Sequence, residues 1–304
     1  MVGIKRYLKL GIVHFMAFPQ TMRGEGPILE TLEKIANDPF FDLVEVGWIK
    51  DPETRRRARE ILEVSGLEVG YGVQPRLLMQ GLDLNTTDEV RRKEAVGVLK
   101  ESVEDALELG AKRLAFLSGK DPGPEGRGRA KELLADSIQQ VCDYASSLDR
   151  DFKIILEIFD RDIDKRCLIG PSREAREVAE LVGRDNFGLM HDLSHLPLLQ
   201  EKPLEALSEV KRYLIHAHLG NCCLEKGSEL YGDQHPRFGI KGGCVGVEEV
   251  VEYLEALKQV GYMDGRKPVP LTIEVKPAKG ESSELVITNA KRTLLKAWEK
   301  LGLQ

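Results

Sequence analysis

The 304-residue sequence has no apolar run that approaches the ~20 residues needed to cross a membrane. Its first residues lack the apolar segment and the small-residue cleavage site of a secretory signal peptide. It also lacks an excess of basic residues, because the formal net charge is −6. An acidic chain has no general attraction to phosphate backbones or acidic membranes. We therefore expect a cytoplasmic protein that binds neither membranes nor nucleic acid.

Cysteine is scarce, with five residues in the whole chain and no pair in C-x-x-C spacing. An odd number without that spacing indicates neither a disulfide framework nor a structural zinc site. We expect reduced thiols, and we assign no role to the adjacent Cys222 and Cys223.

Eight short apolar runs alternate with longer amphipathic stretches along the chain. The runs are Lys9–Phe15, Leu43–Gly47, Glu68–Val73, Arg113–Leu117, Ile154–Ile158, Phe187–Met190, Tyr213–His218 and Leu271–Val275. Runs rich in Val, Ile and Phe and bounded by turn residues are typical of buried parallel strands. Their alternation with helical patterns predicts the α/β class, as a single (β/α)8 TIM barrel over residues 1–304. A doubly wound open sheet is the structural alternative, but no glycine-rich phosphate loop follows the first run.

Local signals mark several helix ends. Asp51 followed by Pro52 predicts a capped helix start. Thr86 and Glu89 have the spacing of a capping box, and the helix that follows should stop at Gly110. The irregular segment 221–245 follows the seventh strand. In a barrel this segment lies on the catalytic face.

Each of the last four predicted strands carries a carboxylate or an imidazole near its C-terminal end. These residues are Glu157, Asp192, His218 and Glu274. Active sites of (β/α)8 barrels form at these strand ends. Burying an unpaired carboxylate is costly, so four such groups at equivalent positions predict a shared cation. Three carboxylates and one imidazole suit one Mn²⁺ or Mg²⁺ ion, with Co²⁺ or Zn²⁺ as alternatives.

Other polar residues at or beyond strand ends are candidate substrate contacts. They are His14, Trp48, His195, His235, Arg237 and Lys276. Lys276 shares a strand face with Glu274, because side chains two residues apart on a strand point the same way. His195 follows Asp192 by three residues, which places it at the edge of the predicted ion site.

Three further positions in this part of the chain have different interpretations. Asp233, which lies two residues before His235, remains open between an ion ligand, a substrate contact and a solvated turn. His191 points to the opposite face from its neighbour Asp192, and His216 lies one layer below His218. We predict that both are structural histidines.

The order of these residues resembles that of the xylose isomerase-like barrel superfamily. The matching set is Glu157, Asp192-x-x-His195, His218, Asp233-x-His235, Gly239, Gly242-Gly243, Gly261-Tyr262 and Glu274. The superfamily includes sugar isomerases, ketose 3-epimerases, hydroxypyruvate isomerase, inosose dehydratase and endonuclease IV. Resemblance to the 3-epimerases implies that Glu157, Asp192, His218 and Glu274 bind one divalent ion. It also implies that His195 contacts a substrate oxygen, and that Glu157 and Glu274 exchange protons with opposite faces of the substrate.

The chain departs from two of these relatives. The epimerases place an arginine shortly after the strand-seven histidine, whereas residues 219–226 contain none, and Arg237 is the candidate substitute. Endonuclease IV has further zinc-binding histidines on strands two and three, whereas residues 44–48 and 70–76 contain no histidine. The missing ligands and the acidic chain disfavour DNA repair.

The predicted site suits proton transfer at a carbon beside a carbonyl. A metal ion chelated by that carbonyl and a neighbouring hydroxyl stabilises an enediolate, and a carboxylate removes the proton. We therefore expect a metal-dependent isomerase or epimerase of a small sugar-like substrate. A dehydratase of the inosose or dehydroshikimate type shares the first step and remains the alternative. A non-catalytic carbohydrate-binding protein is less favoured, and the sequence leaves a homo-oligomer open.

Overall fold

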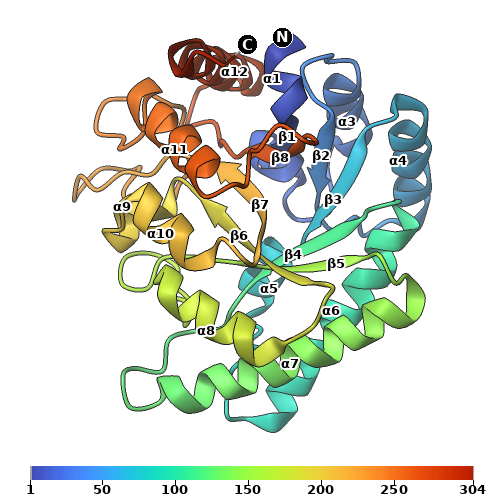
Figure 1. The fold of residues 1–304 in the computed structure, drawn as a ribbon. Coiled ribbons are helices and arrows are strands. Elements are labelled where there is room, and N and C mark those ends of the chain that lie inside the picture. The colour runs from blue at the N-terminus through green and yellow to red at the C-terminus, as the bar shows by residue number, and fades with distance from the viewer. Residues whose placement is uncertain (1, 304) are drawn as a thin grey trace.

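The computed structural model describes residues 2–303, and its eight parallel strands close into a barrel (Figure 1). The strands are β1 (Leu8–Val13), β2 (Leu43–Val46), β3 (Glu68–Gly72), β4 (Arg113–Leu117), β5 (Lys153–Glu157), β6 (Phe187–Asp192), β7 (Leu214–Leu219) and β8 (Val269–Ile273). Each strand pairs with the next along the chain, and β8 pairs with β1. The predicted (β/α)8 class is therefore confirmed.

Long helices between the strands form the outer layer (Figure 1). They are α3 (Ile28–Ala36), α4 (Pro52–Ser65), α6 (Glu89–Glu108), α7 (Arg127–Leu148), α8 (Ser172–Val182), α10 (Pro203–Val210), α11 (Val247–Gln259) and α12 (Ser283–Leu301). The short helices are α1 (Val2–Tyr7), α2 (His14–Ala17), α5 (Gln74–Gln80) and α9 (His195–Leu199), and Pro19–Thr21 forms a 3-10 turn. Helices α1 and α12 lie side by side, with the rings of Tyr7 and Trp298 5.6 Å apart (Figure 1).

The helix-start predictions have mixed outcomes. Asp51 caps α4 as predicted, because its side chain accepts a hydrogen bond of 2.8 Å from the backbone N–H of Thr54. The predicted capping box of Thr86 and Glu89 is wrong. The side chain of Asp88 caps α6 instead, by accepting from the two N–H groups that follow Glu89. An aspartate directly before the first helical residue satisfies these free donors without help from a glutamate.

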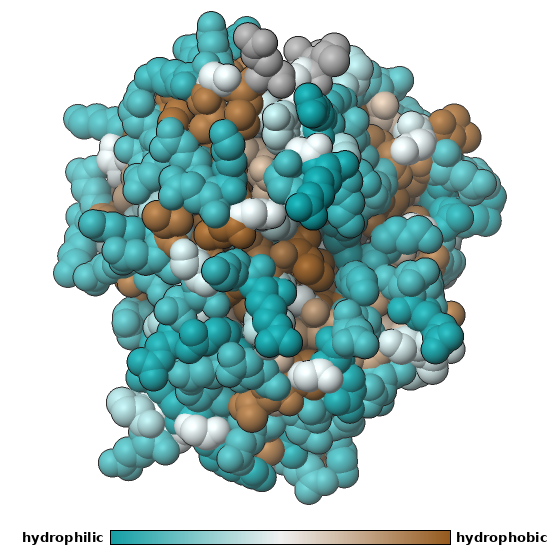
Figure 2. Space-filling view, in the orientation of Figure 1, coloured by the Kyte–Doolittle hydropathy of each residue, from teal (hydrophilic) through white to brown (hydrophobic). Residues whose placement is uncertain are grey.

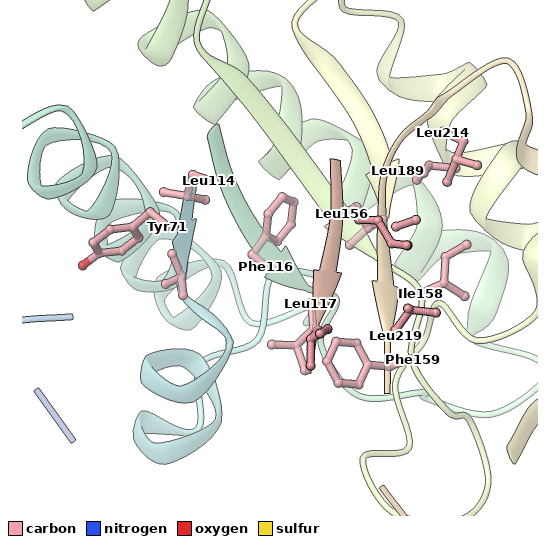
Figure 3. Close-up of a cluster of buried hydrophobic side chains, with 14 of the residues drawn as sticks. Tyr71, Leu114, Phe116, Leu117, Leu156, Ile158, Phe159, Leu189, Leu214 and Leu219 are labelled. Carbon is pink, nitrogen blue, oxygen red and sulfur yellow. The ribbon is translucent and has the colours of Figure 1, made fainter. Parts of the chain in front are cut away.

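Apolar side chains fill two layers, one on each side of the sheet. Between sheet and helices lies a large cluster that includes Phe116, Leu156 and Leu189 (Figure 3). Inside the barrel a small cluster contains Ala115 and Ile155, together with Met190. Because successive strand residues point to opposite faces, Glu157 shares the inward direction of Ile155. The inner apolar layer thus forms the floor beneath the C-terminal strand ends.

Hydrophilic side chains cover most of the face shown in Figure 2, with apolar side chains between them toward its centre. No helix among residues 2–303 combines the length and the apolar character that a membrane crossing requires. The five cysteines are free thiols.

Candidate metal centre

The four predicted ion ligands meet at the C-terminal ends of the last four strands. Glu157 and Asp192 are the final residues of β5 and β6, His218 lies in β7, and Glu274 directly follows β8. All four are buried, and one donor atom from each lies within 4.8 Å of the others.

The spacing of the donor atoms agrees with a shared ion. Nδ1 of His218 lies 2.8 Å from Oε2 of Glu274. The same nitrogen lies 4.0 Å from Oε1 of Glu157 and 4.0 Å from Oδ2 of Asp192. Donors that bind one small dication at about 2.1 Å are separated from each other by roughly 3–4 Å. The group therefore has the dimensions of a mononuclear site.

Two of these donors have no other partner. Oε1 of Glu157 and Oδ2 of Asp192 are buried and make no hydrogen bond with the residues that the structure describes. A buried acceptor left without a partner costs about 1–3 kcal/mol, and more when it is charged. A divalent ion would satisfy both oxygens, so the donor set fits such an ion.

Gly220, just after β7, keeps the space beside these donors open. A Cβ at this position would lie 2.6 Å from Nδ1 of His235 and 2.9 Å from both carboxylate oxygens of Asp192. The backbone N–H of Gly220 donates to Oδ1 of Asp192 at 3.0 Å, and that of Ser194 donates to the same oxygen at 2.7 Å. These bonds orient the Asp192 carboxylate and leave Oδ2 free to bind an ion.

Glu157 and Glu274 experience different electrostatic surroundings. Burial, followed by the charge of Glu274, raises the pKa of the Glu157 carboxyl. Burial also acts to raise the pKa of Glu274, but the positive charges of His235 and His218 and a hydrogen bond with His218 outweigh it and lower that pKa. Carboxyl groups whose pKa values are pushed apart in this way are typical of acid–base sites.

A second group of donors adjoins the first and shares Asp192. It contains Asp192, His195 and His235, all of them buried. Nδ1 of His195 donates to the backbone oxygen of Ile158 at 2.6 Å, which leaves Nε2 as the free nitrogen. Oδ1 of Asp233 lies 3.2 Å from that Nε2 and 2.9 Å from Nε2 of His235, but no hydrogen bond of normal geometry forms. This group could hold a second ion or bind substrate oxygens.

Glu45 of β2, which was not among the predicted site residues, contacts the predicted ligand set. It is 3% exposed, and its Oε1 accepts from Nε2 of His218 at 3.0 Å and from Nε2 of His216 at 2.8 Å. Because a carboxylate only accepts, His218 donates through Nε2 to Glu45 and through Nδ1 to Glu274 in this structure. Glu45 holds Nε2 outside the ligand group, so Nδ1 is the nitrogen that would bind an ion after losing its proton. A signal was present, since Glu45 lies in an apolar run just as Glu157 does.

The two histidines predicted to be structural occupy structural positions. Nδ1 of His216 accepts from Arg113 at 3.3 Å, so His216 donates through Nε2 to Glu45, inside the barrel. His191 lies outside the barrel, where its ring contacts the hydroxyl of Ser172 on α8 at 3.3 Å.

Replacement of Glu45 by glutamine should weaken divalent-ion affinity by about 10–100-fold, because the charged acceptor that orients His218 is lost. Titration against a chromophoric chelator measures this affinity without any substrate. Glu174→Gln is the matched control, because this carboxylate pairs with Arg161 outside the barrel. Equal ion affinities in the wild type and in Glu45→Gln would refute the positioning role of Glu45.

A pocket of about 140 Å³ opens beside the ligand group. Two predicted substrate contacts, His235 and Lys276, line it together with Glu157, Gln74 and Lys165. The amide of Gln74 donates to Oε2 of Glu157 at 2.7 Å, and the amine of Lys276 donates to the side-chain oxygen of Gln234 at 2.9 Å. The structure thus places predicted ligands and two predicted contacts around one cavity.

Three other predicted contacts lie away from this pocket. The first strand ends at Val13, and His14 begins helix α2, where its ring bonds a threonine hydroxyl of α3 at 2.7 Å. The Trp48 ring packs under the guanidinium of Arg76, 4.8 Å away. The guanidinium of Arg237 pairs with Glu281 at 2.8 Å. These three predicted substrate contacts therefore do not line the pocket, whose lining lysines are Lys276 and Lys165.

Comparison with solved structures shows the same fold in proteins of low sequence identity. An IOLI protein with a bound zinc atom is 18% identical, covers 97% of this chain and 99% of its own, and has a TM-score of 0.73. A D-tagatose 3-epimerase-like protein is 20% identical over 97% of this chain and 100% of its own, with a TM-score of 0.71. An L-ribulose 3-epimerase is 17% identical over 96% of each chain, with a TM-score of 0.72.

The comparison with family models identifies a family, whereas the similarity to solved structures shows the fold alone. The search of curated proteins finds no match. A family model described as the xylose isomerase-like TIM barrel matches residues 38–288, which is most of the chain. This match includes Glu157, Asp192, His218 and Glu274. The chain therefore belongs to the xylose isomerase-like TIM barrel family.

Proposed function

We propose that this protein is a divalent-metal-dependent isomerase or epimerase of a small sugar or sugar-like substrate. The observation that carries the proposal is the buried convergence of Glu157, Asp192, His218 and Glu274, with two unpartnered carboxylate oxygens, beside a polar pocket. Two of the three similar structures described above are a 3-epimerase and a 3-epimerase-like protein, which agrees with this class of reaction.

The four converging residues would hold the ion, with Mn²⁺ or Mg²⁺ favoured by the three carboxylates. When bound, the ion supplies Lewis-acid polarisation of the substrate carbonyl. Glu157 takes a proton from the carbon beside that carbonyl, and Glu274 exchanges a proton from the other side. His195 and Lys276 bind substrate oxygens. A carboxylate in this role contributes about 10²–10⁴-fold to the rate.

The position of the returned proton distinguishes the products. Return to the opposite face of the same carbon gives an epimer, and return to the neighbouring carbon gives an isomer. Loss of a β-hydroxyl instead gives dehydration, which is the alternative reaction. All three reactions begin with the same proton removal, so the screen described below detects them together and then separates them by mass.

The test is a screen in D₂O of ketoses, ketose phosphates and inososes with added Mn²⁺, Mg²⁺, Co²⁺ or Zn²⁺. We expect one substrate class to take up solvent deuterium at unchanged skeleton mass, and we expect a chelator to stop the uptake. A loss of one water would identify the dehydratase instead. An ion-loaded protein that exchanges no proton with any of these compounds would refute the proposed reaction.

A further inference from the structure

We propose that the substrate is a ketose that carries a second, uncharged sugar unit, and that this unit binds in a cleft next to the metal pocket. The inference rests on the proposed function, because it assigns the reacting ketose to the metal pocket. It goes further by assigning a binding site to a part of the substrate that does not react.

The cleft lies beside the metal pocket at the C-terminal side of β4. Its volume is about 480 Å³, and Leu78 and Lys165 line both cavities. Ligand pockets typically measure about 300–1,000 Å³. The metal pocket, at about 140 Å³, falls below this range, whereas the cleft falls within it. A substrate that occupies both cavities is therefore larger than one sugar ring.

Backbone hydrogen bonds hold one wall of the cleft in place. This wall consists of the segments after β4 and β5, which meet in an antiparallel bridge between Lys120 and Cys167. The N–H of Leu168 donates to the oxygen of Gly119 at 2.8 Å, and the N–H of Asp121 donates to the oxygen of Arg166 at 3.0 Å. Fixed walls lower the ordering cost of binding, so the cleft is preorganised for a ligand.

The segment after α5 adds a further part of the lining and packs directly against Gly119. A Cβ at Gly119 would lie 1.8 Å from Oδ1 of Asp83, so only glycine lets the segment after α5 come this near. Asp83 is itself held by the N–H of Asn85, which donates to Oδ1 at 2.8 Å. The Asp83 carboxylate lines the cleft as a fixed hydrogen-bond acceptor.

The lining suits a neutral hydroxylated ring. Leu78 and Leu82 offer apolar surface, while Asp83 and Thr86, each of which accepts from a nearby backbone N–H, have further hydrogen-bonding capacity for a ligand hydroxyl. Figure 3 shows Leu117 in the same buried cluster as Phe159, which lines the metal pocket. Sugars present apolar ring faces and hydroxyl edges, and they bind surfaces that mix the two kinds of group.

The charges of the cleft do not favour an anionic group such as a phosphate. The amine of Lys120 donates to the backbone oxygen of Lys165 at 2.7 Å. The amine of Lys165 pairs with Asp164 at 3.1 Å and with Asp233 at 3.2 Å. The lining also contains Arg91, which lies 4.0 Å from Asp88, and the carboxylates of Asp83 and Glu94. A bound phosphate would face the two carboxylates, and two of the three lining cations, Lys120 and Lys165, already have partners.

The test compares D-fructose with the glucosyl-fructoses isomaltulose, leucrose and maltulose in the deuterium-exchange assay. Glu94→Trp and Gln80→Trp each place an indole in the cleft from an exposed helical position outside the metal pocket. Both should raise KM for the preferred disaccharide by about tenfold or more, because the bulky ring excludes the second sugar. They should leave exchange with fructose unchanged. Lys93→Trp, an exposed neighbour on α6 that does not line the cleft, is the control.

The outcomes separate this inference from the proposed reaction. The inference is wrong if the wild-type protein exchanges fructose at least as fast as each disaccharide and the indole variants change the KM of neither kind of substrate. A preference for fructose 6-phosphate that is lost in Lys120→Met would also overturn it, in favour of an anionic ligand. If no ketose exchanges deuterium, calorimetric titration with isomaltulose still decides, because binding that weakens in Glu94→Trp supports the cleft and absent binding refutes it.

Discussion

The Glu157→Gln variant is expected to lose deuterium exchange by about 10²–10⁴-fold, the contribution of a general acid–base group. Glutamine has nearly the same shape and keeps an oxygen that can face the ion, but its amide cannot accept the substrate proton. Glu157 is 2% exposed, and its unpartnered Oε1 lies in the ligand group. Rates are to be measured by mass spectrometry at saturating ion, so that weaker ion binding is not mistaken for lost chemistry.

Ion titration of the same Glu157→Gln protein separates the role of Glu157 as an ion ligand from its role in proton transfer. Glu132→Gln is the control, because this carboxylate is exposed and pairs with a neighbouring arginine on its own helix, in the outer layer. Full exchange by Glu157→Gln with ion bound would remove Glu157 from the proton-transfer step. Glu274 would then be the remaining candidate, and Glu274→Gln tests it in the same assay.

Gly220→Ala should abolish divalent-ion binding, because the added methyl group would enter the space beside the ligands. Its Cβ would lie 2.6 Å from Nδ1 of His235 and 2.9 Å from both oxygens of Asp192, far inside normal contact distance. Either the ligands shift or the strand end moves. Overpacking of this kind typically costs about 1–3 kcal/mol of folding stability. Ion titration and denaturant unfolding measure the two effects separately.

Gly97→Ala is the matched control for this glycine substitution. Gly97 lies in α6, and a Cβ there would meet no atom within 4 Å. Alanine at an open helical position should leave ion binding unchanged and raise stability by about 0.4–1 kcal/mol. If Gly220→Ala bound the ion as tightly as the wild type, the ion would have to lie away from Asp192 and His235.

The strand ends of the second half of the barrel were the most predictable part of the site. Glu157, Asp192, His218 and Glu274 stand out because each is a charged or titratable residue in an apolar run. A closed parallel barrel brings equivalent strand ends to one face, so the fold itself converts this pattern into proximity. Glu45 also lies in an apolar run. Its partner His218 is 173 positions away in the chain, so the sequence could not show that the two side chains are in contact.

The residues beyond strand ends were less predictable. His14 was assigned to a strand end, but β1 ends one residue earlier and the chain turns into α2, which directs the ring toward α3. Arg237 lies in the irregular segment 221–245, where no periodicity fixes the direction of a side chain, and it pairs with Glu281. Lys276 lines the pocket, because its spacing from Glu274 continues the direction of the strand, and its role as a substrate contact stays a prediction.

The sequence by itself determined the barrel, its family and the four donors of the predicted ion site, because alternating apolar runs and buried charges are local patterns that need no coordinates. Only the tertiary structure decided which oxygens lack partners, which nitrogen of His218 faces the donors, and that a cleft adjoins the pocket. These properties depend on distances between loops and strands far apart in the chain. Such distances are set by packing in three dimensions rather than by the order of residues.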